Sequence, residues 1–204
     1  MRSKLGNLCM VLGAALVLTA LSLFLYNQWE ASGAEQSVQA LLPQLQQQLQ
    51  ERQEEQAESG KVPPEQLDPK NYEMTEAEIE GYAYIGYLSI PALRLELPVM
   101  SQWDYERLKI APCRYEGSTK SDDLVLLAHN YGKHFGTLKN LVPGDEVFFT
   151  DMDDVISRYQ VVTVEILTPD AVEEMVAGEY DLTLFTCTYG GQNRVTVRCD
   201  RVKD

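Results

Sequence analysis

The chain has 204 residues, of which 45% are hydrophobic and 24% charged, so its length and composition fit one globular domain with extensions. Its formal net charge is −14, and 12 acidic against 3 basic residues lie between residues 30 and 80. Nucleic-acid binding is not expected of so acidic a chain, because phosphate neutralisation needs clustered Lys and Arg.

An apolar segment near the amino terminus predicts a membrane span. Residues 8–26 carry no charge, and at about 1.5 Å per residue they extend roughly 28 Å, close to the hydrocarbon thickness of a bilayer. Arg2 and Lys4 precede the segment, so we expect a cytoplasmic amino terminus and an extracytoplasmic remainder. A signal peptide cleaved near residues 31–33 is the alternative, although this run is longer than a typical signal core. Residues 1–29 are therefore interpreted as a cytoplasmic tip and retained single-pass anchor.

Residues 30–80 are predicted to form an acidic helical stalk and linker. A helix from about residue 37 to 56 is indicated by aliphatic side chains at three- and four-residue spacing, namely Val38, Leu41, Leu42, Leu45 and Leu49. This stripe has three interpretations: packing on the folded domain, pairing with a second copy, or a solvated stalk. Residues 58–73 contain Ser-Gly, Pro-Pro and Asp-Pro steps, which break regular structure and indicate a linker.

Residues 81–204 have the pattern of short strands separated by turns. Alternating or continuous apolar runs predict strands at residues 84–90, 93–97, 124–128, 146–150, 159–167, 182–188 and 194–202. Pro98 is expected to end the second strand. Short helices are predicted at 135–141 and 171–177. Seven or so short strands within about 120 residues favour a mainly β domain, as a mixed-topology barrel or a sandwich.

Two residues able to do chemistry lie at predicted strand ends. Cys187 ends the strand 182–188 beside a Gly-Gly turn, where a thiol is exposed while its backbone stays rigid. His129 follows the strand 124–128 and is the better candidate for acid/base work near neutral pH. The only other histidine, His134, is expected to be a solvated loop residue. Either position alone is more typical of a structural residue, so the combination carries the interpretation.

Three further residues near the thiol are candidates for the site. Arg194 lies across the Gly-Gly turn from Cys187, and a hairpin would bring its guanidinium beside the thiol, where it can donate to a developing oxyanion. Arg198 competes for this role but is expected to be a cation on the strand surface. Thr186 and Thr188 flank the thiol, and we expect both to contact substrate, with Thr186 acting mainly as structural support.

The remaining cysteines are weaker candidates for the nucleophile. Cys9 lies in the apolar span and is expected to be inert. Cys113, Cys187 and Cys199 make an odd number outside it, which indicates at least one thiol that is free or paired between chains. A disulfide between Cys113 and Cys199 and two free thiols are both consistent with an extracytoplasmic domain. Cys199 lies inside a strand and is a poorer nucleophile candidate than a residue at a strand end.

These residues resemble the sortase family. Residues 183–187, Thr-Leu-Phe-Thr-Cys, with Arg194 downstream, resemble the signature Thr-Leu-x-Thr-Cys followed by an arginine on the next strand. Residues 84–99 resemble the opening strands of the family, and residues 127–147 resemble its histidine strand, short helix and following turn. The resemblance covers three-fifths of the chain in the right order. Two departures bear on subclass: Ala128 stands where the family often has Gly, and the Cys-to-Arg loop is short.

The resemblance implies a sortase-like β-barrel that works as a membrane-anchored cysteine transpeptidase on a Gram-positive cell surface. Cys187 would attack the Thr–Gly bond of an LPXTG-like sorting signal and form a thioacyl enzyme, with His129 as acid/base and Arg194 as transition-state stabiliser. An amine from a cell-wall precursor or another protein would resolve this intermediate. No cofactor is expected. A calcium site in acidic loops occurs in the family, and no ligands for one can be assigned here.

Several alternatives follow from the same residues. Pilin-polymerising sortases often carry an Asp-Pro-aromatic lid and a second membrane span, whereas residues 68–70 are Asp-Pro-Lys and no second apolar run follows. We therefore expect a general anchoring enzyme or one serving a dedicated substrate. Papain-like and NlpC/P60-type peptidases place Cys before His, the reverse of this order. An L,D-transpeptidase has the right order, but its Ser-His-Gly-Cys signature is missing. A non-catalytic membrane-tethered module with a buried Cys187 is the last alternative.

Overall fold

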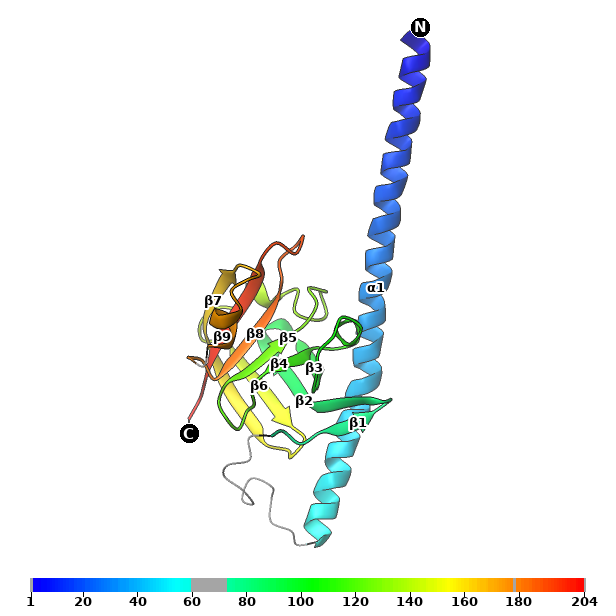
Figure 1. Ribbon diagram of the computed structural model, residues 1–204. Coiled ribbons are helices and arrows are strands. Elements are labelled where there is room, and N and C mark those ends of the chain that lie inside the picture. The colour runs from blue at the N-terminus through cyan, green and yellow to red at the C-terminus, as the bar shows by residue number, and fades with distance from the viewer. Residues whose placement is uncertain (1, 60–72, 178, 204) are drawn as a thin grey trace.

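The computed structural model describes residues 2–59, 73–177 and 179–203, with side chains described from residue 6 to 55 in the first range. These residues form one long helix, α1 (Arg2–Ser59), and a β-barrel beside it (Figure 1). The Asp-Pro-Lys sequence at 68–70 and most of the predicted linker lie outside the described residues.

Nine strands form one sheet that closes on itself. They are β1 (Ala77–Ile79), β2 (Tyr82–Ile90), β3 (Leu95–Met100), β4 (Cys113–Glu116), β5 (Leu124–Leu127), β6 (Glu146–Asp151), β7 (Ile156–Leu167), β8 (Leu182–Cys187) and β9 (Arg194–Arg201). Their order is β1-β2-β3-β4-β5-β8-β9-β7-β6, and β6 also pairs with β2, so β2 to β9 form an eight-stranded barrel. The β3–β4 and β5–β8 pairs are parallel. The expected mainly β, mixed barrel is confirmed.

The predicted strands are all present, although several boundaries differ. The second strand does not end before Pro98, because β3 continues through it to Met100. Met100 is the one residue of β3 in register with β4, so much of one edge of β3 is unpaired, and a proline at such an edge need not remove a ladder hydrogen bond. The sequence interpretation missed β1 and β4, which have only three and four residues and are too short to show a periodic pattern.

Short helical segments connect some of the strands. The helix expected at 171–177 is present as α2 (Val172–Val176). The helix expected at 135–141 is only a single 3-10 turn, η4 (Leu138–Asn140). Two other 3-10 turns are η2 (Pro91–Leu93) and η3 (Arg107–Lys109). The apolar residues that suggested a helix at 135–141 lie three residues apart, a spacing that a 3-10 turn also aligns on one side.

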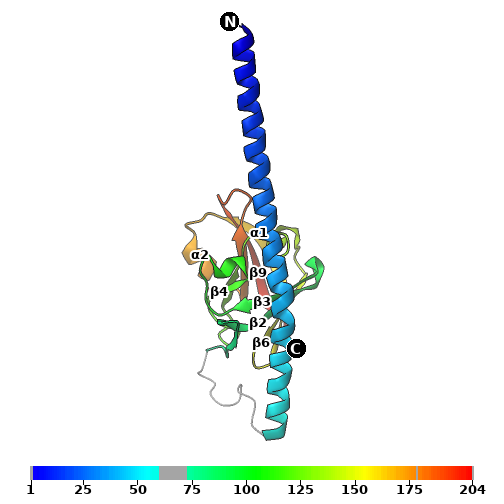
Figure 2. The same ribbon diagram turned by 90° about the vertical axis from the view of Figure 1, so that its right-hand side faces the viewer.

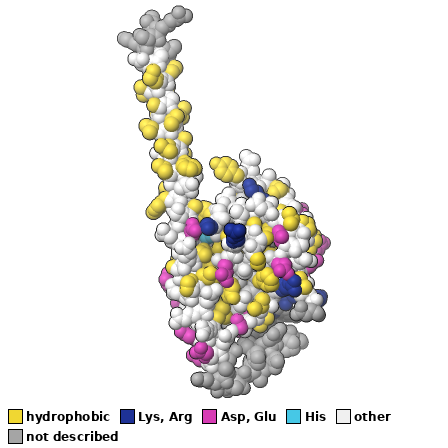
Figure 3. Space-filling view, turned by 180° about the vertical axis from the view of Figure 1, so that it is seen from behind, with side chains coloured by type: hydrophobic (Ala, Val, Ile, Leu, Met, Phe, Trp, Pro, Cys, Tyr) yellow, Lys and Arg dark blue, Asp and Glu magenta, His cyan; other side chains and the backbone are white. Residues whose placement is uncertain are grey.

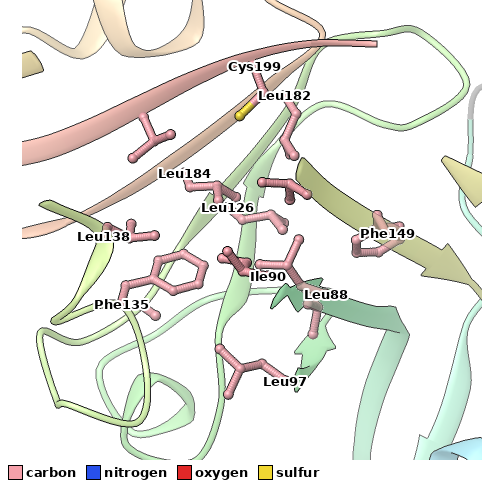
Figure 4. Packing of buried hydrophobic residues seen from close by; sticks show 14 of the residues in the cluster. Leu88, Ile90, Leu97, Leu126, Phe135, Leu138, Phe149, Leu182, Leu184 and Cys199 are labelled. Atoms are coloured by element: carbon pink, nitrogen blue, oxygen red, sulfur yellow. The ribbon is translucent and has the colours of Figure 1, made fainter. Parts of the chain in front are cut away.

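The barrel interior is filled by aliphatic and aromatic side chains that alternate along each strand with outward-facing ones. Figure 4 shows this packing, with Leu88 and Ile90 of β2, Leu126 of β5 and Leu184 of β8 among the inward residues. Phe135 and Leu138, from the segment after β5, pack onto the same cluster. The interior therefore anchors both the strands and the loop that follows β5.

Helix α1 packs along the outside of the barrel (Figure 2). Its buried side chains lie on one stripe, namely Ala34, Val38, Leu41, Leu45 and Leu49. The helix contacts β1, β3 and η3. Among the three interpretations of the apolar stripe, the structure therefore shows packing on the folded domain.

The amino-terminal part of α1 extends beyond the barrel (Figure 1). Its apolar side chains are exposed (Figure 3). Within the described residues, α1 is the one helix long and apolar enough to cross a bilayer by length and composition, and its most apolar window has a mean hydropathy of 2.5. This segment fits a single-pass membrane anchor. The direction in which it crosses remains a prediction from the flanking charges.

The expectation that His134 is a solvated loop residue is wrong. His134 is fully buried and lies near the backbone of Ala34 in α1. Its ring is tilted by 49° against that of Tyr131, at a centroid distance of 5.5 Å. The docked helix covers the loop, which no local pattern in the sequence could reveal. Burial lowers the pKa of His134 to about 4.

Replacing Leu45 with alanine should destabilise the fold. Leu45 is fully buried between α1 and the barrel, so Leu45→Ala should lower the free energy of unfolding by about 2–5 kcal/mol through lost burial and a residual cavity. Urea unfolding of the full chain in detergent measures this change. Gln47→Ala, at an exposed position of the same helix, should change the free energy by no more than about 0.5 kcal/mol. Equal effects of the two variants would contradict the docked helix.

The burial of His134 also predicts an acid-sensitive folded state. The folded protein lowers the pKa of His134 to about 4, whereas the unfolded chain should titrate near about 6.5. Between these two pH values the unfolded state binds one more proton than the folded state. The contribution of neutral His134 to the free energy of unfolding is therefore fully present above about pH 6.5 and is lost as the pH falls toward about 4, by up to roughly 3 kcal/mol. His134→Gln should reduce the slope of stability against pH in urea unfolding. An unchanged slope would refute the assignment.

Candidate active site

The parallel pairing of β5 and β8 brings His129 and Cys187 to the same end of two adjacent strands. Leu127 lies in register with Phe185, and His129 and Cys187 each follow two residues later. Because side chains alternate along extended chain, both should lie on the outward side with Leu127 and Phe185. The hydroxyl of Thr186 donates to the carbonyl of Ala128 at 2.7 Å, which ties the two strand ends together one residue earlier.

A tight hairpin brings Arg194 beside the thiol. Arg194 on β9 lies directly opposite Cys187 on β8. Between them, the N–H of Thr188 donates to the carbonyl of Asn193 at 2.9 Å, and the N–H of Gly191 donates to the carbonyl of Thr188 at 2.8 Å. Gly191 has a φ of 76°, a left-handed conformation that favours glycine. The structure therefore brings all three sequence-predicted residues to one corner of the barrel.

Cys187 differs in its surroundings from the other thiols of the domain. It is free and half-buried, whereas Cys113 and Cys199 are free and fully buried. Burial raises the pKa of Cys113 to about 12 and raises the pKa of Cys199 further, which opposes formation of the reactive thiolate. The sequence was consistent with either a disulfide between Cys113 and Cys199 or two free thiols. In the structure both thiols are free, and they lie in different hydrophobic clusters.

The electrostatics of His129 favour a neutral imidazole. Burial lowers the pKa of His129, Glu30 of α1 opposes that shift, and Lys109 of η3 adds to it. His129 is half-buried, so its imidazole is accessible from one side. A neutral imidazole can accept a proton from a thiol and pass it on, which is the requirement for acid/base work.

The guanidinium of Arg194 is held by its own hairpin. Its Nη1 donates to the carbonyls of Gly191 at 3.1 Å and Asn193 at 3.2 Å. Within the described part of the chain, Nε and Nη2 of Arg194 make no hydrogen bond, and the side chain is half-buried. These N–H groups are therefore free to donate to a substrate oxygen without breaking the hairpin contacts.

Arg198 is not the surface cation that the sequence suggested. Its side chain is 3% exposed, and its guanidinium donates to Glu165 at 2.8 Å and Thr183 at 3.0 Å, with further bonds to the carbonyls of Glu174 and Met175. The segment around α2 covers this part of β9 and supplies those carbonyls. Arg198 is thus occupied in holding α2 to the barrel.

The two threonines beside the nucleophile both bond to the protein itself. Thr186 is buried, and its hydroxyl serves the β5–β8 junction, which agrees with the expected structural support. The hydroxyl of Thr188 accepts from the N–H of Asn193 at 3.0 Å. Contact of either side chain with substrate remains a prediction. Among the described residues, no group of three or more His, Cys, Asp or Glu side chains could hold a metal ion.

The sequence interpretation missed two residues next to His129. The ring of Tyr131 lies 4.9 Å from that of His129, with an interplanar angle of 31°. The side-chain amide of Asn130 donates to the carbonyl of Thr188 at 3.5 Å and links the histidine loop to the hairpin. Both residues stand beside His129 in the sequence, but only the folded loop shows which of them touch the site.

Comparison with known proteins shows the family of this chain. The sequence model of the sortase domain matches residues 88–202. Sortase A of Bacillus anthracis is 29% identical over 125 residues, covering 58% of this chain and 59% of that protein. The chain therefore spans less than two-thirds of the length of this relative.

Solved sortases share the fold. Sortase C1 of Streptococcus suis is 27% identical with a TM-score of 0.52, covering 59% of this chain and 74% of that one. Sortase C1 of Streptococcus agalactiae is 26% identical with a TM-score of 0.52, covering 59% and 68%. Sortase A of Corynebacterium diphtheriae, with a TM-score of 0.55, 22% identity and coverage of 69% and 66%, supports the fold alone. The family match spans more than half of the chain, and this protein belongs to the sortase family.

Proposed function

We propose that this protein is a membrane-anchored cysteine transpeptidase, which cleaves an LPXTG-like sorting signal and transfers the surface protein to an amine. The observation that supports the proposal is that Cys187 and Arg194 lie opposite each other on β8 and β9, and that His129 follows the end of the adjacent strand β5 by two residues. Family membership and the exposed apolar part of α1 support it. The substrates are surface proteins, and the acceptor is a cell-wall precursor or another protein.

The first half-reaction forms a thioester. The neutral imidazole of His129 takes the proton of the Cys187 thiol, and the thiolate attacks the carbonyl carbon of the threonine in the sorting signal. The developing oxyanion accepts hydrogen bonds from the Arg194 guanidinium. The C–N bond to glycine then breaks, and the imidazolium of His129 gives its proton to the leaving amine. The surface protein stays on the sulfur.

The second half-reaction runs the same proton transfers in reverse. An acceptor amine attacks the thioester carbon, His129 takes a proton from that amine, and the sulfur leaves and is reprotonated. A new amide bond forms while the enzyme returns to its starting state. Water competes with the amine for the thioester, so the reaction yields transfer only where the acceptor is bound close to Cys187.

Removing the thiol or the imidazole should abolish or slow thioacyl formation. Cys187→Ala should form no adduct with any LPXTG-like peptide, because no other described thiol of the barrel is exposed. His129→Gln should slow adduct formation by about 10²–10⁴-fold, the usual contribution of general acid–base catalysis. Mass spectrometry of the full chain in detergent measures both. Cys9→Ala, in the apolar segment, is the matched control and should react normally.

If the folded wild-type protein forms no adduct with any peptide of a broad panel, the catalytic proposal fails and the non-catalytic module gains support. A modified Cys113 or Cys199 in place of Cys187 would also contradict the assignment.

Replacing Arg194 tests the oxyanion role. Arg194→Ala should lower the rate of thioacyl formation by about 10²–10³-fold, as loss of an oxyanion donor does in other enzymes. Arg158→Ala, which removes an exposed cation on β7, should leave the rate within about twofold, since exposed ion pairs contribute little. Single-turnover kinetics with a fluorogenic peptide separate this effect from product release. Equal rates for the two variants would remove Arg194 from the mechanism.

Pilin polymerisation is the second candidate function. Sortase C structures are among the similar structures above 25% identity, although the curated relative is a sortase A. The acceptor distinguishes the two candidates. A wall-anchoring enzyme should prefer the amine of a cell-wall precursor, and a pilin polymerase should prefer a lysine of a folded pilin subunit. The sortase match argues against the L,D-transpeptidase alternative.

A further inference from the structure

Helix α1 reaches the loop that carries His129. Glu35 of the helix forms an ion pair with Lys133 at 3.4 Å. The neighbouring residues of this ion pair, Ala34 on the helix and His134 in the loop, are both buried, with 2% and 0% of their surface exposed. The imidazole of His134 lies near the backbone of Ala34.

The aromatic ring of Tyr131 connects this contact to His129. Tyr131 stands between the two histidines, 4.9 Å from the ring of His129 and 5.5 Å from the ring of His134. Within the described residues, neither ring nitrogen of His134 makes a hydrogen bond of ordinary geometry, and the backbone of Ala34 is its polar neighbour. The order of contacts is therefore α1, His134, Tyr131 and His129.

The loop itself is tightly folded, so it can move only as a unit. The N–H groups of His134 and Gly136 both donate to the carbonyl of Tyr131, at 3.0 Å and 2.9 Å, and the N–H of Phe135 donates to the carbonyl of His129 at 3.2 Å. A Cβ at Gly136 would lie 2.4 Å from the carbonyl oxygen of Asn130. A shift of the helix side of this loop should therefore also shift its His129 end.

Charged groups from two other elements act on His129. Glu30 of α1 raises the pKa of His129, and Lys109 of η3 lowers it. Within the loop, His129 in turn lowers the pKa of His134. Burial raises the pKa of Tyr131 to about 12, and Glu30 adds to this shift. The segment of α1 that acts on His129 thus covers Glu30 to Glu35, immediately after the apolar span. The stripe from Val38 to Leu49 already docks the helix on the barrel, so these further contacts are available for a different role.

We propose that residues 30–35 of α1 are a positioning element for His129, and that Tyr131 is the positioning residue through which they act. The docked helix sets the orientation and the burial of the imidazole, so the membrane anchor is part of the catalytic apparatus. This proposal rests on the proposed function, because it assigns a purpose to the position of His129. It makes acid/base work at His129 depend on the juxtamembrane helix.

The test measures the titration of both histidines in the full chain, reconstituted in nanodiscs, by histidine hydrogen–deuterium exchange with mass spectrometry. Ala34→Leu should crowd the contact with His134, displace the loop and raise the pKa of His129 toward its ordinary value of about 6.5, because the imidazole gains solvent. Thioacyl formation should fall about tenfold in kcat, with KM little changed. Ala40→Leu, at an exposed position of the same helix, should change neither quantity.

If Ala34→Leu fails to fold, two further sets of variants test the same contact. Tyr131→Ala should raise the pKa of His129 and slow thioacyl formation, whereas Tyr131→Phe keeps the ring and should retain most of the wild-type values. Glu35→Lys should slow the reaction by up to about fivefold, the limit for an exposed ion pair. Glu35→Lys combined with Lys133→Glu should restore it.

Titration and rate together separate the two proposals. Unchanged titration of His129 in folded Ala34→Leu and Tyr131→Ala would overturn the positioning role, whatever the rates. A wild-type protein that forms no thioacyl adduct would overturn the proposed function, while the titration would still report whether the helix controls the histidine.

Discussion

The site depends above all on the parallel hydrogen bonding between β5 and β8. The residues joined by the Thr186–Ala128 bond are 58 positions apart in the sequence, so this pairing is not local. A slip of one residue would turn every side chain of a strand to the opposite face, and Cys187 would then point away from His129. The buried Thr186 hydroxyl opposes such a slip because it finds its acceptor only in the observed register.

The barrel supports this register because the two faces of β5 pack against different hydrophobic clusters. Leu124 and Leu126 of β5 belong to the interior cluster, whereas Val125 and Leu127 belong to the outer cluster beneath α1. Both faces of the strand are therefore packed, and the strand end has little freedom. A nucleophile carried by such an end keeps its position while its side chain stays accessible.

Helix α1 joins its apolar amino-terminal segment to the barrel more closely than an independent stalk would. It is continuous from Arg2 to Ser59, and one side of it is buried on the barrel while the other carries Gln and Glu. The strand β1, at residues 77–79 within the predicted stalk and linker, pairs with β2. The boundaries proposed at residues 29 and 80 remain predictions. The physical consequence of the docking is that the candidate site lies within a few helical turns of the apolar segment.

Much of this structure could be predicted from local patterns. Alternating apolar residues indicated β7 and β9, a continuous apolar run indicated β5, and the uncharged segment at 8–26 indicated the apolar part of α1, which fits a membrane anchor. Cys187 and His129 could be chosen as candidates because each stands where such a pattern ends. The tertiary structure alone decided that α1 docks on the barrel, that His134 and Arg198 are buried, and that Tyr131 stacks on His129. Burial of a polar side chain depends on which distant segment covers it, and that information is held in contacts between elements rather than in the spacing of residues along one of them.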